Sequence, residues 1–305
     1  MLDMAPGPSD MAGGTLLTVA PTGAETAKSD FPPLPVTLEE LVDAALACER
    51  AGASVIHVHL RDDAAEPTLD VGRARAAVVA LRESTDLVVQ LSTGGAVGDP
   101  EAARLLVLDA DPDSASLSCG TVNFGDGVFL NRWPFMVELY RRMQERGIVP
   151  EFEIFDLGQI DAMLRLLDRF GPPSGGHVHA DLVMGVPGGM PGTAAALIAA
   201  ASALPAGATF SATGVGRTAL PVAFAALAAG GHLRVGCEDT LSFAPGVAVR
   251  DNTQLVERAA SLAGLAQRPP LSTVEARAML GVTDRRGARR VAAGEAAAAA
   301  GGEQG

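Results

Sequence analysis

Residues 37–62, TLEELVDAALACERAGASVIHVHLRD, contain a complete helix-to-strand unit. Thr37 and Glu40 have the T-x-x-E spacing of a capping box, in which each side chain accepts a hydrogen bond from the backbone amide of the other residue. Gly52 is the residue type that most often follows the last turn of a helix. The apolar run VIHVHL comes next and is rich in β-branched residues, which favour strands. The stretch therefore predicts a helix that ends at Gly52, followed directly by a strand.

The same unit recurs along the chain. We expect eight strands, at residues 15–23, 54–62, 86–95, 114–124, 149–156, 179–189, 208–216 and 232–239. We expect helices at residues 37–52, 70–84, 100–108, 130–146, 157–170, 192–203, 218–230 and 252–266. Strict alternation implies parallel strands, and eight such units predict an α/β fold of the (β/α)8 TIM barrel type with a single domain. A doubly wound open sheet is the alternative.

The two ends of the chain differ from the rest in composition. The expected barrel domain covers residues 14–286, whereas residues 1–13 and 287–305 are low in complexity, with AAAAAGGEQG at the tail. Segments of this kind cannot bury enough apolar surface to offset the entropy of ordering, so we expect both to be disordered.

Composition excludes several classes of protein. Hydrophobic residues make up 48% and charged residues 19% of the 305 residues, which fits a globular protein with a large core. We expect no membrane span and no secretory signal, because no apolar run has the required length or flanks. Three cysteines without C-x-x-C spacing favour reduced thiols and a cytoplasmic location. A net charge of −13 argues against nucleic acid as a partner.

Two histidines in the second strand are candidate metal ligands. Side chains alternate along a strand, so His57 and His59 share one face. Neutral imidazoles suit Zn2+ or a related divalent ion, and a catalytic zinc site usually has a third protein ligand. Glu238 is the expected third ligand, because it has the same strand parity as Arg234. Asp239 has the opposite parity and can enter the site only if the chain turns there.

Other histidines compete for this role. His57 and His59 could instead be core residues bonded to carboxylates. His177 and His179 form a second His-x-His pair, but they begin their strand, as does His232. Because barrel chemistry lies at the carboxyl ends of the strands, we interpret these three as structural.

Polar residues gather where the predicted strands end, as a barrel active site requires. Beyond the histidines they include Thr22, Glu25, Ser92, Thr93, Ser118, Thr121, Glu153, Asp156, Arg234, Glu238 and Asp239. Two glycine-rich loops, GVPGGMPG (185–192) and TGVGR (213–217), follow the sixth and seventh strands. Their Gly188, Gly189 and Arg217 are candidates for binding a phosphate-bearing ligand such as a coenzyme A ester, although tight turns explain the glycines equally well.

Taken together, the motifs resemble those of the β-keto acid cleavage enzymes. The resemblance covers about residues 15–266 and rests on VAPTGAE (19–25), HVHLRD (57–62), LSTGG (91–95), EFEIFDLG (151–158), MGVPGGMPGT (184–193), GVGR (214–217) and GGHLRVGCEDT (230–240). It implies a (β/α)8 barrel with a bound divalent metal, usually zinc. It also implies use of acetyl-CoA to convert a β-keto acid into acetoacetate and a new acyl-CoA, and assembly as a homotetramer.

The resemblance also implies residue roles. It assigns the metal to His57, His59 and Glu238, the base to Asp239, and assistance of the base to Arg234. It places Ser92 and Glu25 near the substrate carboxylate and the metal site. By the same resemblance, Ser118 takes the position of a small hydroxyl residue, and Glu153 is a carboxylate that contacts the site residues rather than the substrate. Arg234 is expected to keep Asp239 ionised at neutral pH.

Some positions depart from the family pattern, and rival functions stay open. The stretch AVGDPEAARLL (96–106) is shorter than expected, Phe210 replaces a common tryptophan and Cys237 a common leucine. One rival is a metal-dependent aldolase or acyl-CoA lyase that needs no acetyl-CoA, and another is a non-catalytic barrel that binds a metal or ligand. A Schiff-base aldolase is disfavoured because the only lysine, Lys28, lies on no predicted strand.

Overall fold

The computed structural model describes residues 13–285. The two segments expected to be disordered lie outside the described residues, except for Gly13. Within the described part, eight parallel strands close into a barrel, which confirms the predicted fold and excludes the open sheet. Around the barrel the strands follow one another in chain order: β1 (Leu17–Val19), β2 (Val55–Val58), β5 (Val88–Leu91), β6 (Ser114–Ser118), β9 (Val149–Ile154), β10 (His179–Met184), β11 (Thr209–Gly214) and β12 (His232–Val235).

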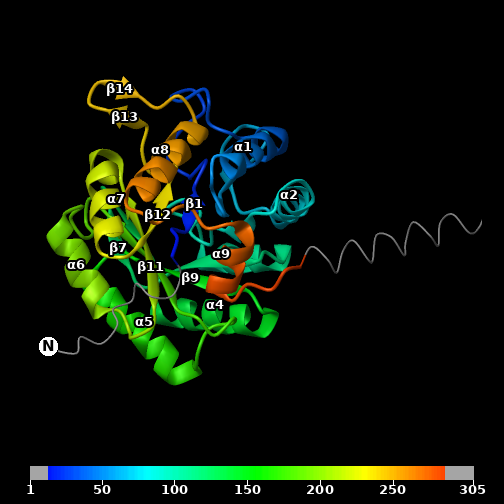
Figure 1. Ribbon diagram of the computed structural model, residues 1–305. Helices are drawn as coiled ribbons and strands as arrows, with labels where there is room; N and C mark the ends of the chain where they lie inside the picture. The colour runs from blue at the N-terminus through cyan, green and yellow to red at the C-terminus, as the bar shows by residue number, and fades with distance from the viewer. Residues whose placement is uncertain (1–12, 286–305) are drawn as a thin grey trace, which may run out of the picture.

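Helices surround the barrel (Figure 1). They are α1 (Leu38–Arg50), α2 (Val71–Ser84), α3 (Glu101–Leu106), α4 (Trp133–Arg146), α5 (Leu157–Phe170), α6 (Ala194–Ala203), α7 (Ala219–Ala228), α8 (Asn252–Leu265) and α9 (Thr273–Leu280), with the short 3-10 helices η2 (Val107–Ala110) and η3 (Gly216–Thr218). The predicted capping box is present, because Thr37 and Glu40 accept hydrogen bonds from each other's backbone amides. None of these helices, within residues 13–285, is long and apolar enough to cross a membrane.

All eight barrel strands are shorter than predicted, because their polar ends leave the sheet. The segment predicted as one strand over 54–62 divides into β2 and β3 (Leu60–Arg61), and β3 pairs antiparallel with β4 (Pro67–Thr68). Two further hairpins form from β7 (Val122–Phe124) with β8 (Gly127–Phe129) and from β13 (Ser242–Ala244) with β14 (Val247–Ala248). These excursions lie beyond the carboxyl ends of β2, β6 and β12, where a barrel places its chemistry.

The two faces of the barrel wall have different chemistry. Along β9, Phe152 and Ile154 belong to the large apolar core, whereas Glu151 and Glu153 alternate with them and face the barrel interior. The register pairs Glu153 with Asp181 of β10, so acidic residues meet inside the barrel. The apolar face packs against the helices, and the interior carries the polar groups.

At the other end of the barrel, α9 covers the amino ends of four strands. Its apolar residues join a separate buried cluster composed of Leu16, Val55, Val88, Val149, Leu271, Ala276, Leu280 and Val282. Arg277 of α9 donates to the carbonyl of Leu87 at 2.9 Å and forms an ion pair with Asp113, which Arg82 of α2 also binds. This end is therefore built for stability, and the opposite end is left for the site.

Gly236, at the end of β12, is the position where a larger residue should do most damage. A Cβ there would lie 1.9 Å from the carbonyl oxygen of Ala20. We expect Gly236→Ala to lower the free energy of unfolding by about 3 kcal/mol. Gly264 of α8 is the matched control, because a Cβ there meets nothing within 4 Å, and Gly264→Ala should be neutral or stabilising by up to about 1 kcal/mol. Urea denaturation measures both, and equal effects would contradict the close contact.

Candidate active site

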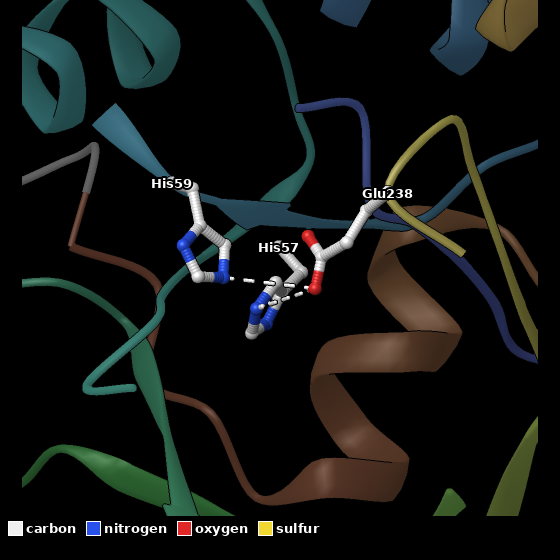
Figure 2. Close-up of side chains that lie close together, drawn as sticks. All are labelled: His57, His59 and Glu238. Atoms are coloured by element: carbon white, nitrogen blue, oxygen red, sulfur yellow. Dashed lines mark ion pairs between the residues drawn. The ribbon is translucent and has the colours of Figure 1, made fainter. Parts of the chain in front are cut away.

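Three side chains that can bind a metal ion lie together at the carboxyl end of the barrel. His57 lies on β2, His59 directly follows it, and Glu238 follows β12. The Nε2 atoms of His57 and His59 lie 3.9 Å and 3.6 Å from the same oxygen, Oε1 of Glu238. Figure 2 shows both rings turned toward this carboxylate. The three residues each offer a ligand atom within 4.8 Å of the others, so one ion could contact all three.

Glu238 reaches this position through a turn rather than through strand alternation. β12 ends before Gly236, whose carbonyl accepts a hydrogen bond from the amide of Asp239 at 3.0 Å. The parity argument for Glu238 was therefore wrong in its reason, although Glu238 and Arg234 do form an ion pair. The same turn brings Asp239 into the site, as its parity required.

Gln90 of β5 fixes the orientation of His57. The His57 Nδ1 atom lies 2.5 Å from Gln90 Oε1, and Gln90 Nε2 donates to Ser114 Oγ at 3.3 Å. An oxygen acceptor places the ring proton on Nδ1, which leaves the Nε2 lone pair directed toward Glu238 and available to a metal. Burial, assisted by the charge of Arg234, lowers the pKa of His57 to about 3, so the ring is neutral.

Arg234 is a buried cation shared by four carboxylates. Its Nη2 atom lies 3.1 Å from Asp239 Oδ1 and also binds Glu238, and its Nη1 atom lies 3.4 Å from Glu153 Oε1 and 3.8 Å from Asp181 Oδ2. Burial opposes its charge, but the surrounding carboxylates hold the pKa of Arg234 well above its ordinary value. The guanidinium therefore stays charged inside the barrel.

The neighbouring carboxylates Glu238 and Asp239 have opposite pKa shifts. Burial alone would raise the pKa of Glu238, but Arg234 and the two histidines outweigh it and lower that pKa to about 2. Burial raises the pKa of Asp239 to about 7, against the opposing effect of Arg234. Burial therefore acts against the expected effect of Arg234 on the ionisation of Asp239. As a result, Asp239 is a stronger base than an ordinary carboxylate.

Two more acids lie in the barrel that the sequence analysis did not single out. Asp181 accepts hydrogen bonds from Thr213 Oγ1 at 2.7 and 2.9 Å, and Glu151 lies 3.6 Å from His179 Nε2. Burial raises the pKa of Glu151 to about 8 and that of Asp181 to about 6. The signal for Glu151 was its two-residue spacing from Glu153, which places both on the interior face of β9.

A cavity of about 210 Å³ opens onto this cluster. The predicted site residues in its lining are Glu25, His59, Ser92, Glu153, Arg234, Glu238 and Asp239. His57 and Ser118 are buried beside it, and the Ser118 hydroxyl donates to Glu153 Oε2 at 2.7 Å. The structure thus brings the metal candidates, the proposed base and the predicted substrate contacts to one cavity.

The loop after β1 holds Glu25 at this cavity. Arg61 Nη2 donates to the carbonyls of Gly23 and Thr26 at 2.8 and 2.9 Å, and it thereby fixes the segment on both sides of Glu25. The Glu25 carboxylate is exposed, whereas Ser92 is buried and accepts an amide hydrogen bond within its own loop. Arg61, to which the sequence analysis gave no role, thus supports the position of Glu25.

The predicted phosphate-binding residues lie on the expected loops but outside the cavity lining. A Cβ at Gly188 would lie 2.2 Å from the carbonyl oxygen of Asn123, and the amide of Gly189 donates to Val186 at 3.0 Å. Both glycines therefore have packing and turn roles. Arg217 is exposed on η3. Phosphate binding at these residues stays a prediction.

The remaining histidines lie at the amino ends of the strands. Thr209 Oγ1 lies 2.7 Å from His177 Nε2 and 2.7 Å from His179 Nδ1. The backbone amide of Leu16 donates to His232 Nδ1 at 2.9 Å. These bonds connect strands, which supports the structural interpretation.

Comparison with known proteins places the chain among named relatives. The sequence model of the beta-keto acid cleavage enzyme family matches residues 15–282. The chain is 38% identical over 274 residues to the 3-keto-5-aminohexanoate cleavage enzyme of Acetoanaerobium sticklandii, covering 88% of this chain and 98% of that protein. It is 32% identical over 271 residues to the 3-oxoadipate:acetyl-CoA acetyltransferase of Cupriavidus necator, covering 88% and 94%.

Among solved structures, ObcA without ligand has a TM-score of 0.73 and 21% sequence identity, over 82% of this chain and 66% of that one. A ternary complex of ObcA with a C4-CoA adduct and oxalate also has a TM-score of 0.73. At this level of identity, the likeness supports the barrel fold alone.

His232 predicts how stability depends on pH. Burial, with Arg268 nearby, lowers the pKa of His232 to about 3, so the native ring stays neutral. The unfolded ring takes up a proton near pH 6.5, so stability should fall as pH drops from about 6.5 toward 3, by at most about 1.4 kcal/mol per pH unit for this group. His232→Asn keeps a hydrogen-bond acceptor without titrating, and it should reduce the loss of stability between pH 7 and pH 5.5. Urea denaturation of the two metal-free proteins at pH 7 and pH 5.5 measures this loss. An equal loss in the wild type and in His232→Asn would contradict the prediction that His232 is buried in its neutral form.

Proposed function

The chain belongs to the beta-keto acid cleavage enzyme family, and on that premise we propose that it uses acetyl-CoA to cleave a β-keto acid. The observation that carries the proposal is the meeting of His57, His59 and Glu238 with Asp239 and Arg234 at one cavity. The proposed enzyme is an acyltransferase. A β-keto acid, R-CO-CH2-COO⁻, and acetyl-CoA would give R-CO-S-CoA and acetoacetate.

The donor set fits a divalent metal ion. Glu238 Oε2 is buried and, among residues 13–285, has no hydrogen-bond partner, so it is available to a ligand. Two histidines and one glutamate are a set that catalytic zinc sites use, and we assign Zn2+ on that basis, with other divalent ions possible. A bound ion there would supply Lewis acidity toward the keto and carboxylate oxygens of the substrate. His57, His59 and Glu238 would hold it.

Asp239 is the proposed general base. It lies in the cavity lining next to Glu238, and burial raises its pKa above that of an ordinary carboxylate, which favours proton abstraction. It would remove a proton from C2 of the β-keto acid, and C2 would then attack the thioester carbonyl of acetyl-CoA, whose C–S bond would break to release coenzyme A as its thiolate. Coenzyme A would add to the distal carbonyl, the C2–C3 bond would break, and Asp239 would return its proton to C2 of acetoacetate.

Arg234 is the proposed positioning residue for this base. Two of its nitrogens face Asp239, at 3.1 Å from Oδ1 and 3.5 Å from Oδ2. Glu153 and Ser118 help to hold Arg234 in place, because Ser118 donates to the Glu153 carboxylate, which accepts from Arg234. This arrangement fixes the direction in which the Asp239 oxygens point.

The remaining assignments rest on the cavity and on the family. Ser92 and Glu25 line the cavity and are proposed to contact the substrate. Arg217, Gly188 and Gly189 follow strands that end at the cavity and are proposed to face coenzyme A. We also propose a homotetramer, on the basis of the family alone. A cytoplasmic location is proposed as well, and it agrees with three cysteines that are buried and unpaired.

The metal assignment is tested by metal content. We expect His57→Ala to lose stoichiometric Zn2+, because it removes one ligand of three. His177→Ala is the matched control from the other His-x-His pair and should retain the metal. Mass spectrometry of the purified proteins and Zn2+ titration calorimetry measure both. Full metal content in His57→Ala would disprove the ligand set.

The reaction is tested by incubating the zinc-loaded protein with a panel of β-keto acids, with and without acetyl-CoA. We expect acetoacetate and a new acyl-CoA only when acetyl-CoA is present. Asp239→Asn should keep the metal and lower kcat by about 100-fold or more, because it removes the base.

Each other outcome has a definite meaning. Cleavage without acetyl-CoA would identify a lyase, and no reaction across the panel with metal bound would support the metal site but leave its substrate unknown. A normal rate for Asp239→Asn would exclude Asp239 as the base.

A further inference from the structure

One side of the active-site cavity is made of apolar side chains. We name this side the aromatic wall and define it by the residues Phe124, Phe129, Phe155, Val183, Val186 and Val215. They come from β7, β8, β10 and the segments that follow β9, β10 and β11. The wall therefore occupies one sector of the barrel mouth.

The aromatic wall is tightly packed. The centroids of the three phenyl rings lie 6.2 to 6.4 Å apart in edge-to-face arrangements, which is the preferred geometry of aromatic pairs. Phe129 and Phe155 are buried, and the Arg104 guanidinium lies 4.6 Å from the Phe129 centroid. A wall fixed in this way can select a ligand by shape and polarity, because little ordering is needed on binding.

The guanidinium of Arg104 does not bring a free charge to the cavity. Its nitrogens donate to the carbonyls of Thr93 and Leu130 and to Asn131 Oδ1. It is 1% exposed and lies behind Phe129 rather than in the cavity lining. The aromatic wall therefore offers no charged partner to a ligand.

The charged and ionisable groups of the cavity lie elsewhere. His59, Glu153, Arg234, Glu238 and Asp239 belong to the metal and Arg234 cluster. The remaining charged residue in the lining, within the described part of the chain, is Glu25 on the loop after β1. In the barrel order, β10 is the third strand from β1 and β9 is the fourth. Glu25 therefore lies on a different sector of the barrel mouth from the wall residues that belong to or follow β9 and β10.

We infer that the β-keto acid taken by this enzyme has an uncharged, apolar side chain, such as a short alkyl or aryl group, that packs against the aromatic wall. This inference rests on the proposed function, because the metal cluster fixes the keto acid end and leaves the side chain to the rest of the cavity. A charged side chain there would lose its hydration without gaining a partner.

Three substrates of equal carbon number test this inference. They are 3-oxohexanoate, with an alkyl end, 3-oxoadipate, with a carboxylate, and 3-keto-5-aminohexanoate, with an ammonium group. Calorimetry on the zinc-loaded protein without acetyl-CoA measures binding, and kcat/KM with acetyl-CoA measures turnover. We expect 3-oxohexanoate to bind and react roughly 100-fold better than the charged acids. Equal affinities, or a preference for either charged acid, would overturn the inference, and an ammonium preference would point to Glu25.

A pair of phenylalanine variants tests whether the preference for an apolar side chain comes from the aromatic wall. Phe124 is half-buried on the β7–β8 hairpin, outside the barrel sheet, and Phe224 is 55% exposed on α7. Phe124→Ala should weaken 3-oxohexanoate binding about tenfold or more and leave the KM for acetyl-CoA within about twofold, because a buried aromatic contact is lost. Phe224→Ala should change neither value.

Two outcomes distinguish a failure of this inference from a failure of the proposed function. A rise in the KM for acetyl-CoA in Phe124→Ala, without loss of alkyl selectivity, would assign the wall to the thioester arm and overturn the inference. Absence of turnover for all three acids would contradict the proposed function, yet the binding order of the three acids would still support or overturn the apolar preference.

Discussion

The buried charge of Arg234 is the constraint on which the site depends. Four carboxylates meet inside the barrel, and a low-dielectric interior tolerates them only with a shared cation and hydrogen bonds from neighbours such as Ser118 and Thr213. The interior of this barrel therefore contributes less to stability than an apolar filling would. The apolar layer between the strands and the helices, together with the α9 cluster, supplies that stability.

This arrangement gives two adjacent carboxylates different roles. The turn at Gly236 places both Glu238 and Asp239 in contact with the same guanidinium, yet of the two only Glu238 also faces the two imidazoles. The pKa of Glu238 is consequently low, as a metal ligand requires, whereas burial raises that of Asp239, as a base requires. Pairs of titratable groups separated in this way are typical of catalytic sites.

Much of the fold and of the candidate site could be predicted from local signals in the sequence. The capping box at Thr37 and the alternation of strands and helices predicted the barrel, and the spacing of His57 and His59 predicted the metal candidates. Strand parity failed at Glu238 because the sheet ends before it and a turn sets its direction. Gln90 carries no motif of its own. The aromatic wall could not be predicted because its members come from separate segments that only the closed barrel brings together.

Closure of the barrel also has a consequence for synthesis of the chain. The backbone amide of Leu16, directly before β1, donates a hydrogen bond to His232, which is 216 residues later in the sequence. During translation, one edge of β1 therefore waits for its partner, on the order of 10 to 40 s at ordinary ribosome speeds. An unpaired strand edge is open to wrong pairing during that interval. A slow ribosome or a premature stop before β12 would therefore lengthen the time during which this edge is unpaired and open to wrong pairing.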